Sequence, residues 1–153
     1  MSADELAEMG PIDYVLIEWP RPRPTGEIAS IVVDLVDRGT IRILDLAFMT
    51  KGEDGSVAAL EISDIGEEIE ELKVFQGASS GLVSDDDIIE AGSALEPGSA
   101  GALLVFENSW AAPFAMAVRR SGGQLVANGR IPVQAVVAAL DALEEVWDKD
   151  AES

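Results

Sequence analysis

The chain has 153 residues, of which 10 are basic and 29 acidic, and its formal net charge is −19. The length fits one domain, and a hydrophobic share of 48% is too high for a disordered chain. The absence of His and Cys excludes imidazole and thiol catalysis, disulfides and the common zinc sites. We therefore expect a protein that is not an enzyme and that binds no cofactor and no metal.

The negative charge is concentrated in three segments. Residues 1–13, 61–96 and 141–153 carry net charges of −4, −10 and −5, and the remainder of the chain is neutral. Such a protein is not expected to bind nucleic acid or an anionic membrane, because both surfaces are negative. The acidic segments favour solubility, and the alternative is that they dock a basic protein partner.

The same pattern predicts the domain organisation. We expect an acidic N-terminal tail (1–13), a single domain (14–147) with an acidic insert at about 64–99, and an acidic C-terminal tail (148–153). The N-terminal segment lacks the apolar core of a signal peptide, and no uninterrupted apolar run of about 18 residues is present. These features predict a cytoplasmic protein that does not insert into a membrane.

The first half of the chain predicts a strand, a helix and a hairpin. β-forming residues fill 14–19, and apolar residues at helical spacing predict a helix at about 26–38. Two further strands are predicted at 41–50 and 57–62, joined by a polar turn with two glycines. Asp45 interrupts one apolar face of the first of these strands.

The middle of the chain predicts two helices and a central strand. Residues 64–76 have helical spacing and a dense acidic face. Ser84 is placed to cap a short helix at 85–94, whose first three residues are acidic. The continuous apolar run within 100–107 is typical of a strand that has neighbours on both sides.

The C-terminal part predicts a helix, a strand and a second helix. The first helix begins near Asn108 or Ser109 and ends at Arg120, and a short strand is expected at 124–128. Pro132 is placed at the first turn of the last helix. Its buried stripe is expected to consist of Val133, Val136, Val137, Leu140 and Leu143.

The element order β-α-β-β-α-β predicts an α+β fold of the ferredoxin-like, or split βαβ, type, extended by a C-terminal helix-strand-helix. Helices would then cover one face of the sheet. Apolar residues on the other face, including Ile43 and Met49, predict self-association through that open face, as a homodimer or higher homo-oligomer.

One weak candidate for a ligand site lies before the first helix. Arg21 and Arg23 flank the predicted helix start, where Thr25 and Gly26 present backbone N–H groups. Two guanidinium groups beside a helix N-terminus can bind a phosphate or a carboxylate. The alternatives are a solvated proline-rich loop and a proline motif that docks to a partner.

Two acidic groupings have a functional and a structural interpretation. The run 85–87 lacks the ligand spacing of a calcium loop, so a helix start explains it better than a cation site. Glu18 and Glu107 would form an acid–base pair if they met in one pocket. The sequence favours a structural salt bridge instead, with Arg42 or Arg130 as the partner.

A resemblance covers nearly all of residues 10–140. The stretches Gly10–Tyr14, Thr25–Ala29, Leu35–Leu46, Leu95–Gly98, Glu107–Ala111 and Gly129–Pro132 carry it. On these residues the chain resembles an uncharacterised family of small acidic bacterial proteins. It is also distantly similar to predicted membrane-associated stress proteins that have a glycine-rich hairpin, which is reduced here to a short stretch around 77–81. The resemblance implies no activity and no catalytic residue.

Together these observations favour a non-enzymatic, self-associating protein-interaction domain in a stress-related or regulatory setting. The alternative function is a small domain that binds an anionic ligand through the loop and N-terminus of its first helix.

Overall fold

The chain forms two compact units, Met1–Gly122 and Gly123–Ser153. The first is a mixed α+β unit, and the second contains a single helix. The computed structural model describes residues 8–19, 26–61, 75, 77–78 and 80–152.

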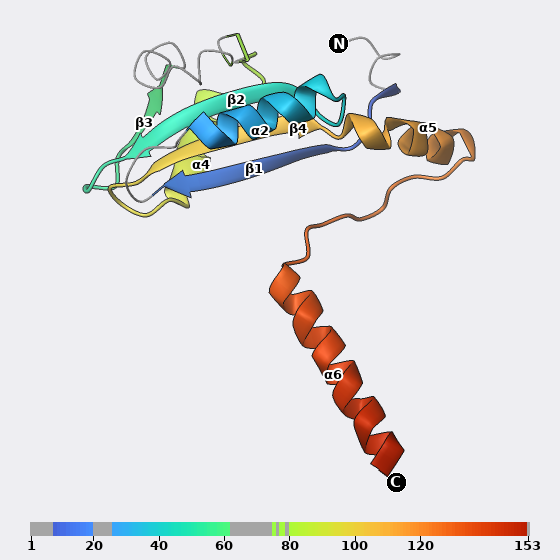
Figure 1. The fold of residues 1–153 in the computed structure, drawn as a ribbon. Helices are drawn as coiled ribbons and strands as arrows, with labels where there is room; N and C mark the ends of the chain where they lie inside the picture. Colours follow the sequence, from blue (N-terminus) through green and yellow to red (C-terminus); the bar gives the residue numbers. More distant parts are fainter. Residues whose placement is uncertain (1–7, 20–25, 62–74, 76, 79, 153) are drawn as a thin grey trace. The chain divides into compact units, whose positions relative to one another are not determined.

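The first unit is organised around a four-stranded antiparallel sheet (Figure 1). Its strands are β1 (Ile12–Trp19), β2 (Arg42–Lys51), β3 (Val57–Leu60) and β4 (Ala100–Glu107), in the order β1-β4-β2-β3. All four predicted strands of this sheet are therefore confirmed. The hairpin of β2 and β3 is confirmed too, as is the central place of β4, which pairs with β1 on one side and β2 on the other.

The register of the strands separates two sets of side chains. Leu104 of β4 lies opposite Val15 of β1 and Leu46 of β2, so these three residues share one face. A bulge between Ile43 and Asp45 shifts the pairing of β2 with β4 by one residue. Such a bulge changes where side chains point next to it.

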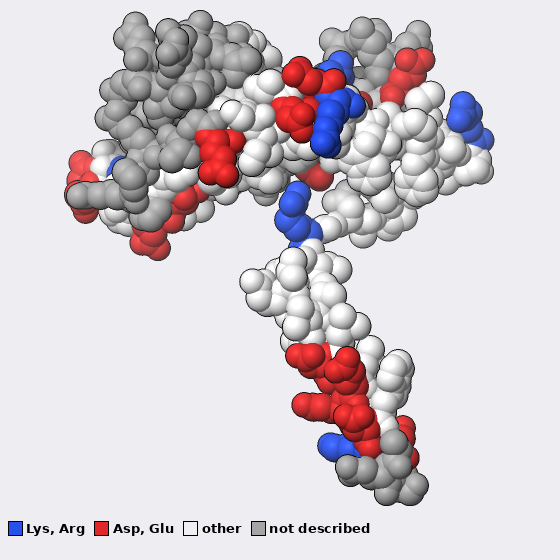
Figure 2. Space-filling view, viewed as in Figure 1, with Lys and Arg blue, Asp and Glu red and all other residues white. Residues whose placement is uncertain are grey.

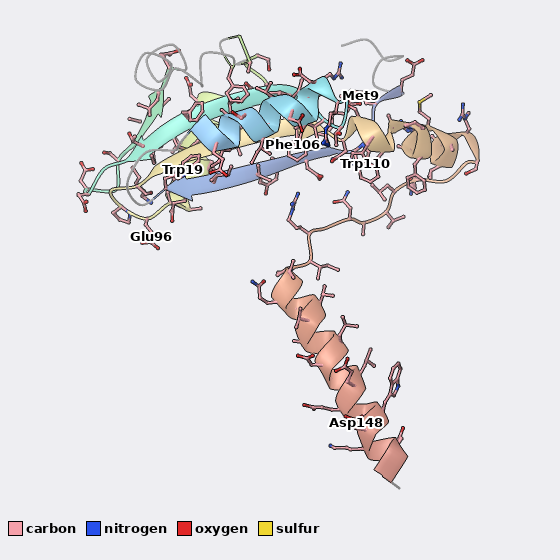
Figure 3. All side chains as sticks on the ribbon, in the orientation of Figure 1. Met9, Trp19, Glu96, Phe106, Trp110 and Asp148 are labelled. Carbon is pink, nitrogen blue, oxygen red and sulfur yellow. The ribbon has the colours of Figure 1, made fainter. Side chains whose placement is uncertain are left out.

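Helix α2 (Gly26–Asp37) covers one face of the sheet and confirms the first predicted helix. Partly buried apolar residues of α2, such as Val32 and Val33, pack on the main core. Phe106 of β4 lies under this helix (Figure 3). The buried members of the core are Ala29, Ile41, Leu46, Phe48, Phe75, Ala102, Leu104 and Phe106.

Helix α4 (Asp85–Ser93) also confirms a predicted helix, but it lies on the opposite face. It packs with Met49, Leu95 and Leu103, and Met49 is completely buried. The expectation that helices cover only one face was therefore wrong, and Met49 does not lie on an open face. Ile43 packs against the α2-face core instead. A mixed α+β unit is established, whereas the ferredoxin-like plan is not.

The chain changes faces at the outer edge of β2. Phe75 is still part of the α2-face core. Ser80 then donates its hydroxyl hydrogen bond to the Leu44 carbonyl, over 2.7 Å, beside the bulge. β3 pairs with β2 only at residues 48–51, so the first part of β2 leaves room for the chain to cross from one face of the sheet to the other. The predicted helix at 64–76 lies outside the described residues, apart from Phe75.

The C-terminal elements differ from the prediction at one point. A 3₁₀ turn (Ser109–Ala111) leads into α5 (Ala112–Arg120), and α6 (Val133–Glu152) is the last helix. The predicted strand at 124–128 is wrong, because residues 123–132 have no regular structure. Strand residues need a partner for their backbone groups, and the described part of the second unit offers only a helix.

Candidate binding surfaces

An open groove of about 490 Å³ lies on the α4 face of the sheet, between α4 and β1. Its floor is apolar, and Tyr14 in that floor is 73% exposed. The groove is therefore open to a partner. The floor residues are Ile12, Tyr14 and Leu16 from β1, with Leu103 and Val105 from β4.

One side of α4 forms the wall of this groove. Asp87, Glu90, Ala91 and Ala94 follow one another at helical spacing, and all four line it. The two alanines keep this wall low, while the two carboxylates make it acidic. The groove thus combines an apolar floor with an acidic wall.

A capping box begins α4, as the sequence predicted for Ser84. The Ser84 hydroxyl accepts a hydrogen bond from the Asp87 N–H at 3.2 Å, and the Asp87 carboxylate accepts one from the Ser84 N–H at 2.9 Å. The hydrogen bonds from the backbone N–H and the side chain of Ser84 hold the pKa of Asp87 below its ordinary value. The acidic run at 85–87 thus includes a helix cap.

Asp45 fixes the segment that leads into α4. This carboxylate is only 2% exposed and accepts hydrogen bonds from three backbone N–H groups. The donors are Leu46 at 2.8 Å, Ser80 at 3.0 Å and Val83 at 2.7 Å. Val83 itself lines the groove, so Asp45 determines where that edge of the groove lies.

Glycines bring α4 and β4 close to their neighbours. A Cβ atom on Gly92 would lie 2.5 Å from Cγ1 of Val57, and one on Gly101 would lie 2.8 Å from a Leu95 methyl carbon. Only a residue without a side chain allows this approach of α4 to β3. The position of the groove wall therefore depends on Gly92.

Glu18 and Glu107 do not form an acid–base pair. Glu18 lies opposite Gly101, six positions along β4 from Glu107, and its carboxylate accepts a hydrogen bond from the Glu96 N–H at 2.7 Å. Glu107 is 6% exposed and accepts one from the Gly10 N–H at 2.8 Å. Its ion pair with Nε of Arg42, at 3.1 Å, confirms the predicted salt bridge.

Of the predicted anion site, the structure describes only Gly26. Arg21, Arg23 and Thr25 lie outside the described residues, and Gly26 is the first residue of α2. Binding of an anion there stays a prediction. Within the part of the chain that the structure describes, no cluster of three or more acidic side chains is arranged to hold a metal ion.

A second, much smaller cavity lies between α2 and the sheet. It holds about 50 Å³, and residues such as Trp19, Phe48 and Phe75 line it. All its lining residues are hydrophobic. A cavity of this kind offers no group that recognises a polar ligand.

Helix α6 presents another candidate surface. The predicted stripe exists, but in residues 123–152 no second helix or strand covers it. Trp147 extends it by one heptad from Leu140. The members Val133, Val136, Val137, Leu140, Leu143 and Trp147 are 44–72% exposed.

Charge divides α6 into two halves (Figure 2). Residues 133–140 contain no charged side chain, whereas the half from Asp141 onward is strongly acidic. Asp148 is one of these acids (Figure 3). Asp141, Glu144, Glu145 and Asp148 follow one another at helical spacing.

The fold and its surfaces define an α+β unit with an open, acidic-walled groove, followed by an amphipathic helix. The chain belongs to a family of unknown function (DUF6325), whose model matches residues 8–147. No curated protein and no solved structure matches the chain. Among the described residues, no helix combines the length and apolar character needed to cross a membrane.

Proposed function

We propose that this chain is a non-enzymatic protein-interaction domain that self-associates through the apolar stripe of α6. The apolar stripe, which no helix or strand of residues 123–152 covers, carries the proposal. Most of the stability of a helix in a protein comes from packing its apolar face, and α6 has nothing to pack against in residues 123–152. A second copy of the helix would supply that surface. The stress-related or regulatory setting stays a prediction from the sequence.

The charge pattern favours an antiparallel pair of α6 helices. In a parallel pair, the two acidic halves would lie side by side and repel one another. In an antiparallel pair, each acidic half lies beside the uncharged residues 133–140 of its partner. Arg130, three residues before α6, then comes near the acidic end of the partner helix. This arrangement buries apolar surface and lowers the repulsion.

Sedimentation equilibrium of the full chain at micromolar concentration tests the proposal. We expect the mass of a dimer for the wild type and of a monomer for Leu140→Asp, because a charge in the stripe opposes burial. Ala138→Asp is the matched control. It adds the same charge on the opposite side of α6, so its dimer should persist. A monomeric wild type, or equal masses for the two variants, would overturn the proposal.

A further inference from the structure

We infer that the groove on the α4 face docks an amphipathic helix of another protein that carries Lys or Arg beside its apolar side. This inference does not depend on the proposed function. The partner is defined by two properties of the groove, its apolar floor and its acidic rim.

The uncovered part of the face has the width of one helix. Strands lie about 4.8 Å apart, so the strip formed by β1 and β4 is about 10 Å wide. A helix with its side chains is about 10 Å wide. Because α4 packs on Met49 and Val57, it covers the β2 and β3 side of the face. The strip over β1 and β4 remains, and a helix that lies parallel to α4 would complete the layer.

The floor and wall fit the apolar side of such a helix. Leu16 and Leu103 lie at the base of the groove, and the exposed ring of Tyr14 offers further apolar surface. On the wall, Ala91 and Ala94 have side chains small enough for two helices to approach closely. Packing against a sheet face also explains why the occupant is a helix rather than an added strand, which would pair with the edge of β1.

The rim selects the charge of the partner. Asp87 and Glu90 stand on the α4 side, and none of the described residues that line the groove is basic. Lys or Arg on the flank of the docked helix that faces α4 would complement these carboxylates. A second copy of α6 fits poorly, because its acidic half would face the same acids.

A designed peptide provides the test. The probe is an amidated, fluorescently labelled 14-residue peptide of Leu and Lys with Leu at helical spacing, and binding to the full chain is measured by fluorescence anisotropy. We expect the Tyr14→Ala/Glu90→Gln variant to bind this peptide at least about tenfold more weakly than the wild type does. A tenfold change in affinity corresponds to about 1.4 kcal/mol of binding free energy. A scrambled peptide, and one with Glu in place of Lys, should also bind at least about tenfold more weakly.

Phe114→Ala/Glu27→Gln is the matched control, because it removes one exposed aromatic ring and one exposed carboxylate elsewhere. Its affinity should stay within about twofold of the wild type. Chemical shifts of backbone amides should change on peptide addition at 12–16 and 87–94, which also shows that the protein tested is folded. The inference would be overturned if both double variants lost the same amount of affinity for the peptide, or if the scrambled peptide bound as tightly as the original one.

Two results would assign the groove to another occupant and would also overturn the inference. If the Tyr14→Ala/Glu90→Gln variant forms a smaller assembly than the wild type, a second copy of this chain occupies the groove. If Leu140→Asp raises the affinity for the peptide at least about tenfold, α6 occupies it. Neither result is produced by failure of the α6 pairing alone, which leaves peptide binding to the groove unchanged.

Discussion

The two faces of the sheet are held in different ways. Under α2, eight buried hydrophobic residues of the described part of the chain form one continuous cluster. Under α4, the buried cluster has three described members, and the buried carboxylate of Asp45 organises the backbone that leads into the helix. Apolar burial therefore stabilises the first face, whereas hydrogen bonds and close contacts position the second. The groove lies on the second face, where a partner can still add apolar contact.

Asp45→Ala should have the largest effect of the substitutions that follow from this comparison. It removes the acceptor of three backbone N–H groups in a site that is 2% exposed. Buried donors left without acceptors cost about 1–3 kcal/mol each, and water will reach some of them, so we expect about 2–4 kcal/mol less stability. Urea unfolding measures the loss. Hydrogen exchange should show the fastest new opening at Ser80 and Val83.

Asp34→Ala is the control on the other face. Asp34 is an exposed residue of α2, and its carboxylate pairs with Nε of Arg38 at 3.2 Å. An exposed pair of this kind contributes little, so we expect a change below about 0.5 kcal/mol. If the two Asp variants lose equal stability, the buried carboxylate does not organise the α4 face as we describe.

Gly92→Ala should have a smaller effect of about 1–2 kcal/mol. The new methyl group would meet Val57, so α4 must move away from β3, at a cost of about 1–3 kcal/mol. Alanine favours a helix over glycine by up to about 1 kcal/mol, which offsets part of that cost. Thermal or urea unfolding measures the difference. Ser93→Ala, an exposed change in the same helix, should stay within about 0.5 kcal/mol.

A second variant separates this contact from other causes. Val57→Ala removes the methyl groups that the new Cβ would meet. The double variant Gly92→Ala/Val57→Ala should therefore lose less stability than the sum of the two single variants, by at least about 0.5 kcal/mol. Simple additivity would show that the approach of α4 to β3 does not depend on Gly92.

Local patterns predicted most elements of the first unit, because strand alternation and helix caps are written in neighbouring residues. Ser84, three residues before Asp87, identified a helix start that the capping box confirms. The side of the sheet on which that helix lies could not be predicted. Asp45 was visible as an interruption of an apolar face, but its partners Ser80 and Val83 lie 35 and 38 residues away.

The candidate surfaces were harder to predict than the strands. The groove depends on which face α4 covers, so the sequence pointed to an open sheet face and to the wrong residues, Ile43 and Met49. The prediction of a strand at 124–128 was wrong for a related reason. Its residues favour a strand locally, but a strand forms only where another one pairs with it. The predicted salt bridge between Arg42 and Glu107 was confirmed, because a buried acid at a strand end needs a cation nearby.

The smallest expected effect concerns the pH dependence of the α4 cap. Because the pKa of Asp87 is lowered in the folded protein, the capping box contributes its full stability above the ordinary Asp pKa. That contribution is lost as the pH falls through the lowered value. A carbon NMR titration of the Asp87 carboxyl group should show Ser84→Ala raising its pKa towards the ordinary value. Protection of the first amides of α4 should fall as well, since an N-cap is lost.

Asp54 is the internal control in the same titration. Its pKa is also lowered, because its carboxylate accepts hydrogen bonds from the hydroxyl and the N–H of Ser56, at 2.7 and 3.0 Å. Ser84→Ala should leave that pKa unchanged, since Asp54 lies in the loop between β2 and β3 and not at the cap. A common shift of both groups would mean that Ser84→Ala alters the fold as a whole. An unchanged Asp87 would mean that the capping box does not hold α4 in solution, and the wall of the groove would then depend on Asp45 and Gly92 alone.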